Sequence, residues 1–306
     1  MLNNCKYDSY HAFSNLINVI LYKITNTFKT MKKILFPTDF SEVANNAFVH
    51  ALGLAKLVHG ELILLHTYEL PIVDNQFAPQ NYQVLFDSLE LSNFEKFKDE
   101  VPKLRAIAEE NHFEDIKMSH MIMDGDLMYN IKEIIKKDKI DYVVMGTSGA
   151  TGWKEAFLGT NTGEAIVNLS VPVLSIPKDC KYTKIETIGF TTRYREKDKE
   201  ALKQVLKIAK SAGGKVKCLY VKTKATDNTE ATFDDWKEQF KNDPVTFFIL
   251  PNEDVKESIS DFITHQEIDV LAMLTYKRSF FESLFSSSFT EKMSYNSEVP
   301  ILALHQ

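Results

Sequence analysis

Short apolar runs alternate with amphipathic stretches from about residue 32 onward. The first run, Lys33–Pro37, is too brief for a helix and ends at a proline. Ser41 then stands where a helix cap is expected, and apolar residues follow it at intervals of three and four until His59 and Gly60. This opening predicts a buried strand followed by a helix that ends at His59.

The same alternation continues through the first half of the chain. Further strands are predicted at 62–65, 116–122, 142–145 and 171–176, and helices at 88–111, 126–137 and about 160–169. Continuously apolar strands that alternate with helices are typical of a parallel sheet covered on both faces. The pattern therefore predicts an α/β fold with a doubly wound parallel sheet, for which we expect the strand order 3-2-1-4-5.

The pattern occurs twice in the chain. Ile34–Asp39 aligns with Ile188–Arg193 at an offset of 188 − 34 = 154 residues. Asp141–Met145 aligns with Asp269–Met273 at a smaller offset, 269 − 141 = 128 residues. The second copy therefore has a middle connection that is shorter by 154 − 128 = 26 residues. A self-similarity of this kind, with both ends of the pattern repeated, predicts two homologous tandem domains.

The two predicted domains cover residues 32–178 and 184–306, and residues 1–30 form an N-terminal extension. A different pattern begins at Met31, so the extension is interpreted as a loosely attached, flexible segment or as the product of an upstream start. A short helix over residues 11–24 that packs on the body is the alternative.

Composition and charge limit the classes of function. The chain has 306 residues, of which 44% are hydrophobic and 25% are charged, and 36 basic against 42 acidic residues give a net charge of −6. This balance argues against a general nucleic-acid or anionic-membrane binder, since such proteins usually carry a basic face. The early apolar stretch Leu16–Ile24 is shorter than the ~20 residues of a membrane span. Partners of neither class are expected.

Cysteine usage points to a reducing compartment. Cys5, Cys180 and Cys218 lie far apart, and the sequence contains no C-x-x-C pair. A disulfide framework or a zinc site is therefore not expected, and the predicted location is the cytoplasm.

Two loops at predicted strand ends carry the candidate chemistry. Pro37-Thr38-Asp39 follows the first strand, and a glycine-bearing loop from Gly146 to Asn161 follows the fourth. Ligands of open parallel sheets bind outside the carboxyl ends of the strands, where the strand order reverses. With the order 3-2-1-4-5 these two strands are neighbours at that point, so one cleft would face both loops.

The chemistry of the two loops suits a nucleotide. Glycines let backbone N–H groups approach phosphate oxygens, and a helix that opens at Gly159-Thr160 favours an anion at its N-terminus. Thr160 and Asn161 add side-chain donors, and an ionised Asp39 accepts hydrogen bonds from an amine or a ribose hydroxyl. The residues indicate a site with a base or sugar near Asp39 and phosphates on the glycine loop. The alternative is that the glycines only form turns.

Other catalytic and metal-binding patterns are absent from the sequence. It contains no P-loop, no G-x-G-x-x-G fingerprint and no G-x-S-x-G elbow. The histidines form no H-x-x-x-H pair and are interpreted as strand or helix-surface residues. Asp124-Gly125-Asp126 is interpreted as a turn followed by a helix cap rather than as a cation site. We therefore assign no catalytic residue and no metal ligand.

At these residues the sequence resembles a known family. Gly146-x2-Gly149-x9-Gly159-Thr160 fits the G-x2-G-x9-G-[ST] signature of ATP-binding universal stress proteins. The segments Ile34–Ser41 and Val171–Pro177 are also similar to that family's first strand and last strand. The resemblance covers nearly all of residues 32–306 and implies a Rossmann-like fold of the universal stress protein type.

The resemblance also implies the ligand and the residues that contact it. The ligand would be ATP, alone or with Mg²⁺, with Asp39 on the adenine or ribose and Thr67 along the base. Ser148 stands where many relatives carry a basic residue. The implied contact residues are Pro37, Thr38, Asp39, Thr67, Met145, Gly146, Ser148, Gly149, Gly159, Thr160, Asn161 and Thr162.

The second domain has lost these residues. Arg193 replaces Asp39 at the offset of 154, and at the offset of 128 Leu274, Lys277 and Ser287-Ser288 replace the signature glycines and threonine. Larger side chains would fill the space for phosphate. We expect that the second domain does not bind ATP.

The ends of the two domains suggest how they associate. Val171–Ile176 and Val299–Leu304 could pair edge to edge within one chain and form a pseudo-dimer, since an unpaired edge is a liability in a sheet. The alternative is that each edge pairs with another chain in a homodimer. The acidic segment Asp227–Asp243 is expected to form an amphipathic helix that covers the second domain, with a partner-binding face as the alternative.

These observations favour one function and leave two alternatives. The favoured one is a tandem universal stress protein whose first domain binds ATP and which acts as a ligand-dependent regulator or scaffold in the stress response. The first alternative is an interaction protein of the same fold that binds no nucleotide. The second is a slow ATPase or phosphotransferase, for which the sequence supplies no positioned nucleophile.

Overall fold

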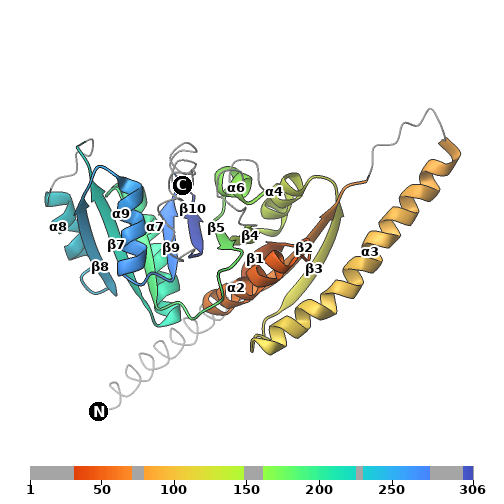
Figure 1. Ribbon diagram of the computed structural model, residues 1–306, viewed down its shortest axis with the longest axis horizontal. Helices are drawn as coiled ribbons and strands as arrows, with labels where there is room; N and C mark the ends of the chain where they lie inside the picture. The colour runs from red at the N-terminus through yellow and green to blue at the C-terminus, as the bar shows by residue number, and fades with distance from the viewer. Residues whose placement is uncertain (1–30, 71–78, 148–160, 225–229, 276–298, 306) are drawn as a thin grey trace, which may run out of the picture. The chain divides into compact units, whose positions relative to one another are not determined.

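The described strands form a ten-stranded sheet in the order β3-β2-β1-β4-β5-β10-β9-β6-β7-β8. The structure is a computed structural model, and it describes residues 31–70, 79–147, 161–224, 230–275 and 299–305 (Figure 1). Residues 32–306 constitute one compact unit. The predicted N-terminal extension, residues 1–30, lies outside the described residues.

The strands of the first half run from residue 32 to residue 177, and those of the second half from 187 to 304. The first five are β1 (Lys32–Pro37), β2 (Gly60–Tyr68), β3 (Met118–Asp124), β4 (Tyr142–Thr147) and β5 (Val173–Pro177). The second five are β6 (Thr187–Thr191), β7 (Lys215–Lys222), β8 (Val245–Pro251), β9 (Val270–Leu274) and β10 (Ile301–Leu304).

The described helices alternate with these strands. In the first half they are α2 (Glu42–Val58), α3 (Pro79–Glu110), α4 (Leu127–Asp138) and α6 (Asn161–Asn168). In the second half they are α7 (Glu196–Ala212), α8 (Glu230–Gln239) and α9 (Val255–His265). The α/β fold class is therefore confirmed.

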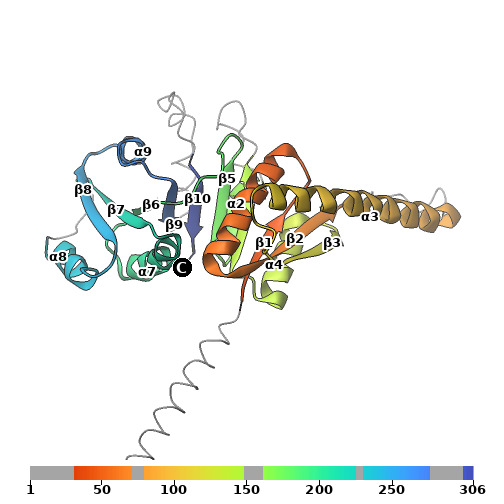
Figure 2. The same ribbon diagram turned by 90° about the horizontal axis from the view of Figure 1, so that it is seen from below.

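The predicted strand order is confirmed in both halves. The first half reads β3-β2-β1-β4-β5 and the second half β8-β7-β6-β9-β10, with every pair within a half parallel. Between the halves, β5 and β10 pair antiparallel, with Leu174 opposite Leu302. Figure 2 shows the strands side by side in this order, from β3 on the right to β8 on the left.

Alternating side chains of the inner strands bury both faces of the sheet. Ile34 and Phe36 of β1 belong to a core shared with α2, α3, α7 and α8, while Leu35 belongs to a second core shared with α4, α6 and α9. Because side chains alternate across a strand, a doubly wound sheet needs apolar residues at consecutive positions. This is why its strands appear in the sequence as unbroken apolar runs.

Local capping signals mark the helix ends as expected. The Ser41 hydroxyl accepts a hydrogen bond from the Ala44 N–H and caps α2, which ends at His59 in the left-handed conformation with φ 54°. Asp126 caps α4 by accepting a hydrogen bond from the Tyr129 N–H, after Gly125 with φ 92°. The interpretation of residues 124–126 as a turn and a cap is confirmed.

Helix α3 begins nine residues earlier than its predicted start at residue 88. Pro102 lies inside the helix. Phe97, Leu104 and Ala108 in its C-terminal part are buried, whereas Val84 and Leu91, which lie nearer its N-terminus, are exposed. Periodicity marks the part of a helix that packs on a core, which is where the helix was predicted.

Helix α8 is the second half's counterpart of α3 and confirms the predicted amphipathic helix. Trp236 is fully buried and Phe233 packs on the same core. The two helices have 32 and 10 residues, so they account for 32 − 10 = 22 of the 26 residues by which the middle connections differ.

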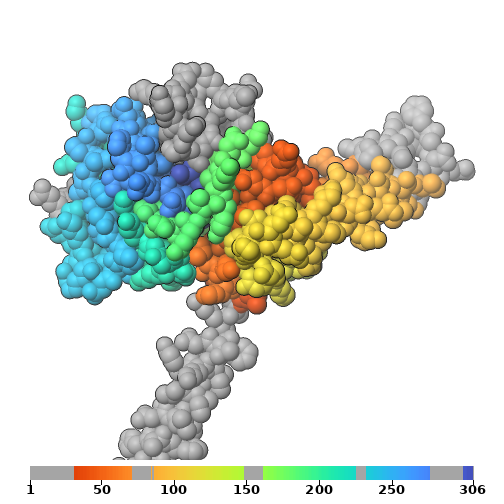
Figure 3. Space-filling model, turned by 60° about the horizontal axis from the view of Figure 1, so that its bottom comes forward, coloured from red at the N-terminus to blue at the C-terminus, as the bar shows by residue number. Residues whose placement is uncertain are grey.

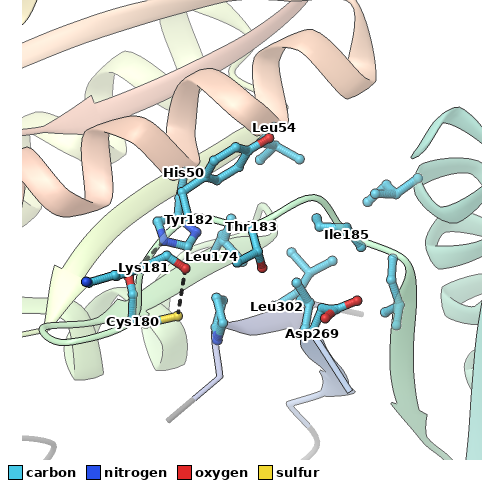
Figure 4. Close-up of a pocket in the computed structure, with 14 residues that line it drawn as sticks. His50, Leu54, Leu174, Cys180, Lys181, Tyr182, Thr183, Ile185, Asp269 and Leu302 are labelled. Carbon is cyan, nitrogen blue, oxygen red and sulfur yellow. Dashed lines mark hydrogen bonds between the residues drawn. The ribbon is translucent and has the colours of Figure 1, made fainter. Parts of the chain in front are cut away.

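Helix α2 holds the segment that connects β5 to β6. The Asn46 side-chain amide donates to the carbonyls of Pro177, Lys178 and Cys180, at 3.3, 3.3 and 2.9 Å. The interpretation of His50 as a helix-surface residue is wrong, because this segment covers it and His50 Nε2 lies 3.1 Å from the Cys180 carbonyl (Figure 4).

The ring of Tyr182 also packs on α2. A Cβ on Gly53 would lie 2.3 Å from that ring, so this glycine makes room for it. A cavity of about 40 Å³ lies beside the ring and is lined by residues that include Leu54, Ile185 and Leu302. Figure 3 shows the connecting segment, in green, crossing the surface between α2 and the second half.

Candidate functional site

A cleft of about 710 Å³ lies at the carboxyl ends of the first-half strands. Eight of the twelve residues predicted to contact ligand line it: Pro37, Thr38, Asp39, Thr67, Met145, Gly146, Asn161 and Thr162. The other four, Ser148, Gly149, Gly159 and Thr160, lie outside the described residues. The cleft therefore joins residues from segments more than a hundred positions apart.

The turn after β1 forms one wall of the cleft. The Thr38 N–H donates to the Leu65 carbonyl at 2.8 Å, and the Thr38 hydroxyl oxygen accepts from the Phe40 N–H at 3.0 Å. The Thr38 carbonyl accepts from Nδ1 of His66 at 2.8 Å. Phe40 takes the left-handed conformation with φ 64°. These contacts hold Asp39 between two constrained residues.

Asp39 is exposed at the rim of the cleft. Its Oδ1 accepts a hydrogen bond from the Ser41 N–H at 3.0 Å. The described residues supply no hydrogen bond to its Oδ2. A carboxylate oxygen only accepts when ionised, so Oδ2 is suited to a hydroxyl or an amine of a ligand.

The opposite wall comes from the end of β4 and the start of α6. A Cβ on Gly146 would lie 2.9 Å from the Val43 carbonyl oxygen, so only glycine lets β4 pass α2 this closely. The Thr162 hydroxyl donates to the Gly146 carbonyl at 2.9 Å and ties the first turn of α6 to the strand. Asn161 begins α6 and lines the cleft, and the N-terminus of a helix favours an anion.

The charged side chains in the described lining of the cleft are all acidic. Asp39, Glu69 and Asp126 line the cleft, and the described lining contains no lysine, arginine or histidine. Within the described residues, no group of three His, Cys, Asp or Glu side chains is arranged to hold a metal ion. Attraction for an anion on this described surface therefore comes from neutral donors, such as the backbone N–H groups at the start of α6 and the Asn161 side chain.

Sequence reasoning missed half of the described lining. Ser41 was expected only as a helix cap, and Gly125 and Asp126 only as a turn followed by a helix cap. The missed residues are Ser41, Val43, Ala44, Glu69, Gly125, Asp126, Leu127 and Thr147. One signal was available: Thr147, Gly125 and Glu69 stand two, three and four residues after the ends of predicted strands, and the ligand site of a parallel sheet lies at that edge.

The second half repeats the turn but not its chemistry. The Thr192 N–H donates to the Leu219 carbonyl, the Thr192 hydroxyl accepts from the Tyr194 N–H, and Tyr194 has φ 54°. Arg193 stands where Asp39 does, and Leu274 ends β9 where Gly146 follows Met145. The replacements at 277 and 287–288 lie outside the described residues.

Known proteins match the chain as follows. The model of the universal stress protein family matches residues 30–177. Universal stress protein MJ0577 of Methanocaldococcus jannaschii is 30% identical over 159 residues, which are 48% of this chain and 95% of that protein. Universal stress protein MJ0531 of the same organism is 29% identical over 158 residues, 52% of this chain and 89% of that protein.

A solved structure matches most of the chain. The crystal structure of a universal stress protein from Archaeoglobus fulgidus aligns with 90% of this chain and 99% of its own, with a TM-score of 0.70 and 16% identity. At this identity the match shows the fold alone. None of the helices in the described ranges combines the length and the apolar character needed to cross a membrane.

Proposed function

This chain belongs to the universal stress protein family, and from this premise we propose that its first half binds ATP, alone or with Mg²⁺. We propose further that occupancy of the cleft makes the protein a ligand-dependent regulator or scaffold in the stress response. The supporting observation is one cleft that joins Asp39 to the start of α6, with the glycine signature of ATP-binding members between β4 and that helix.

The described donors and acceptors fit the two ends of such a ligand. Asp39 Oδ2 is available for a ribose hydroxyl or the adenine amine, and Thr67 lines the same cleft. Backbone N–H groups of the glycine loop and of α6 would receive the phosphates. Because the described acidic residues do not form a metal-binding group, Mg²⁺ would be held chiefly by the phosphates.

The same proposal assigns a structural role to the second half. Residues 32–178 and 184–306 would be tandem domains, and the β5–β10 pairing would replace a contact between two chains with one inside a single chain. The antiparallel register of Leu174 with Leu302 supports this pseudo-dimer. The replacement of Asp39 by Arg193 and of Gly146 by Leu274 supports a second domain that binds no ATP.

Thermal unfolding of the full chain with and without Mg-ATP tests the proposal. A ligand at 100 times its dissociation constant stabilises a protein by about 2.7 kcal/mol, which shifts the midpoint measurably. Asp39→Ala and Gly149→Lys should each reduce the shift. Arg193→Ala, the matched change in the second half, should leave it intact. No shift of the wild type at millimolar nucleotide would reject ATP binding.

A further inference from the structure

We propose that His66 is the positioning residue of the cleft, and that its hydrogen bond to the Thr38 carbonyl holds Asp39 in place for the ligand. The proposal rests on the proposed function for its effect on affinity. His66 lies on β2, next to Thr67, which lines the cleft. It was interpreted from the sequence only as a strand residue.

Only the histidine can be the donor in the hydrogen bond between His66 and the Thr38 carbonyl. His66 Nδ1 lies 2.8 Å from the Thr38 carbonyl oxygen, and a carbonyl oxygen can only accept, so Nδ1 carries the proton. The His66 side chain is buried. Its ring packs against Phe40, at 4.9 Å between centroids, and against Phe97 of α3, at 6.2 Å in a stacked arrangement, and these two phenylalanine rings lie 5.9 Å from each other. This packing keeps the imidazole from turning away from the carbonyl.

The turn needs such a contact because it contains an unfavourable backbone conformation. Phe40 has φ 64°, a region that L-residues other than glycine, asparagine and aspartate seldom adopt. Its N–H is held by the Thr38 hydroxyl oxygen at 3.0 Å. His66 therefore acts on both sides of Asp39, because it bonds the carbonyl before Asp39 and packs on the ring after it.

The second half holds the same turn from another direction. Tyr220 occupies the position of His66 at the offset of 154, and its buried hydroxyl has no hydrogen-bond partner among the described residues. The turn is held instead by Oδ2 of Asp198, which accepts from the Thr192 hydroxyl at 2.9 Å and the N–H groups of Arg193 and Arg195 at 2.7 and 3.2 Å.

The position of Asp198 shows why it matters which element carries the residue that holds the turn. Asp198 is fully buried on α7 and corresponds to Ala44 of α2, a residue that lines the first cleft. A carboxylate at this position of the helix occupies the space between the helix and the turn. His66 comes from the neighbouring strand instead, so position 44 of the helix stays an alanine that lines the cleft. His66 thus fixes the turn without occupying the space of the ligand.

Three variants of the full chain test the proposal by calorimetric titration with Mg-ATP, at a temperature where each is folded. His66→Phe keeps the aromatic packing and removes the donor, so affinity should fall about tenfold, the usual effect of one lost hydrogen bond. His66→Asn places an amide donor near the position of Nδ1 and should recover most of the affinity. Tyr220→Phe, the matched change in the second half, should keep wild-type affinity.

Wild-type affinity in His66→Phe would overturn the proposal. Equal losses in His66→Phe and His66→Asn would overturn it as well, because the loss would then not follow the donor. A merely structural role predicts that affinity falls only in proportion to the unfolded fraction, which the melting curve of each variant gives.

Hydrogen exchange separates this proposal from nucleotide binding. The N–H groups of Phe40 and Ser41 are bonded to Thr38 and Asp39, so they report on the turn without any ligand. Their exchange should be faster in His66→Phe than in the wild type and unchanged in Tyr220→Phe. If the wild type does not bind Mg-ATP, the proposed function fails while this measurement still decides the role of His66. Unchanged exchange in His66→Phe would overturn that role.

Discussion

In the first half of the chain the turn after β1 ends in an exposed aspartate, whereas the same turn after β6 carries an arginine and a buried carboxylate behind it. Thr38 and Thr192 make corresponding hydrogen bonds, and the residues two positions later both take the left-handed conformation. The turn therefore keeps the same backbone conformation although Arg193 replaces Asp39. A duplicated fold can keep this geometry while only one copy keeps residues suited to a ligand.

The residue at the end of β4 shows the same difference between the two halves. Gly146 is required in the first half because α2 passes so close to the end of β4, and Thr162 then bonds to the same residue. Leu274 stands at the corresponding end of β9 and is buried. In the second half the Leu274 side chain therefore fills the position that Gly146 leaves empty in the first half.

The largest expected effect is the removal of Asp198. Its carboxylate is fully buried and satisfies three donors of the second turn. Asp198→Ala leaves the buried Thr192 hydroxyl and the part-buried N–H groups of Arg193 and Arg195 without this acceptor. A buried donor without an acceptor costs about 1–3 kcal/mol and a part-buried one less, so the free energy of unfolding should fall by about 3 kcal/mol. Urea unfolding measures this change. Asp39→Ala, at the exposed equivalent turn, is the matched control and should change stability far less. Equal stability of Asp198→Ala and wild type would contradict the assigned contacts.

A smaller effect is expected at the close approach of β4 to α2. Gly146→Ala would place a Cβ 2.9 Å from the Val43 carbonyl oxygen, and overpacking of this kind costs about 1–3 kcal/mol. Gly189→Ala on β6 is the matched control, because the nearest atom there is also at 2.9 Å but belongs to the side chain of Ile268, which can shift. Urea midpoints should therefore fall more for Gly146→Ala, and a larger loss for Gly189→Ala would contradict this explanation.

The smallest expected effect is a pH dependence at the segment between the halves. Burial lowers the pKa of His50 below its usual value of 6.5, and the bond to the Cys180 carbonyl only partly opposes this. The unfolded chain then binds the proton more readily than the folded one. Stability contributed by neutral His50 is complete above about pH 6.5 and is lost as the pH falls toward the lowered pKa, by at most about 1.4 kcal/mol per pH unit.

Melting temperatures between pH 7.5 and 5 measure this effect. His50→Gln keeps a donor for the Cys180 carbonyl and removes the titration, so its melting temperature should fall less on acidification. Burial also lowers the pKa values of His120 and His305, so part of the dependence should remain in this variant. An unchanged pH profile in His50→Gln would show that His50 does not carry the effect.

Much of the architecture follows from local signals in the sequence. Apolar runs and three-and-four spacing depend on neighbouring residues alone, so they predicted the order of strands and helices, and the repeat at offsets of 154 and 128 predicted two equal strand orders. Caps at Ser41 and Asp126 were also predictable, because a cap acts within three residues. Strand ends, together with the family signature, indicated eight described residues of the cleft.

Tertiary structure alone decided how those residues are held. His66 bonds a carbonyl 28 positions away, and Asn46 bonds carbonyls more than 130 positions away. The same holds for Gly146, whose role depends on Val43 of another element. Spacing along a chain encodes contacts within one helix or strand, but a contact between elements depends on where folding brings the chain back. The elements were therefore predictable from the sequence, and the contacts that hold the cleft open were not.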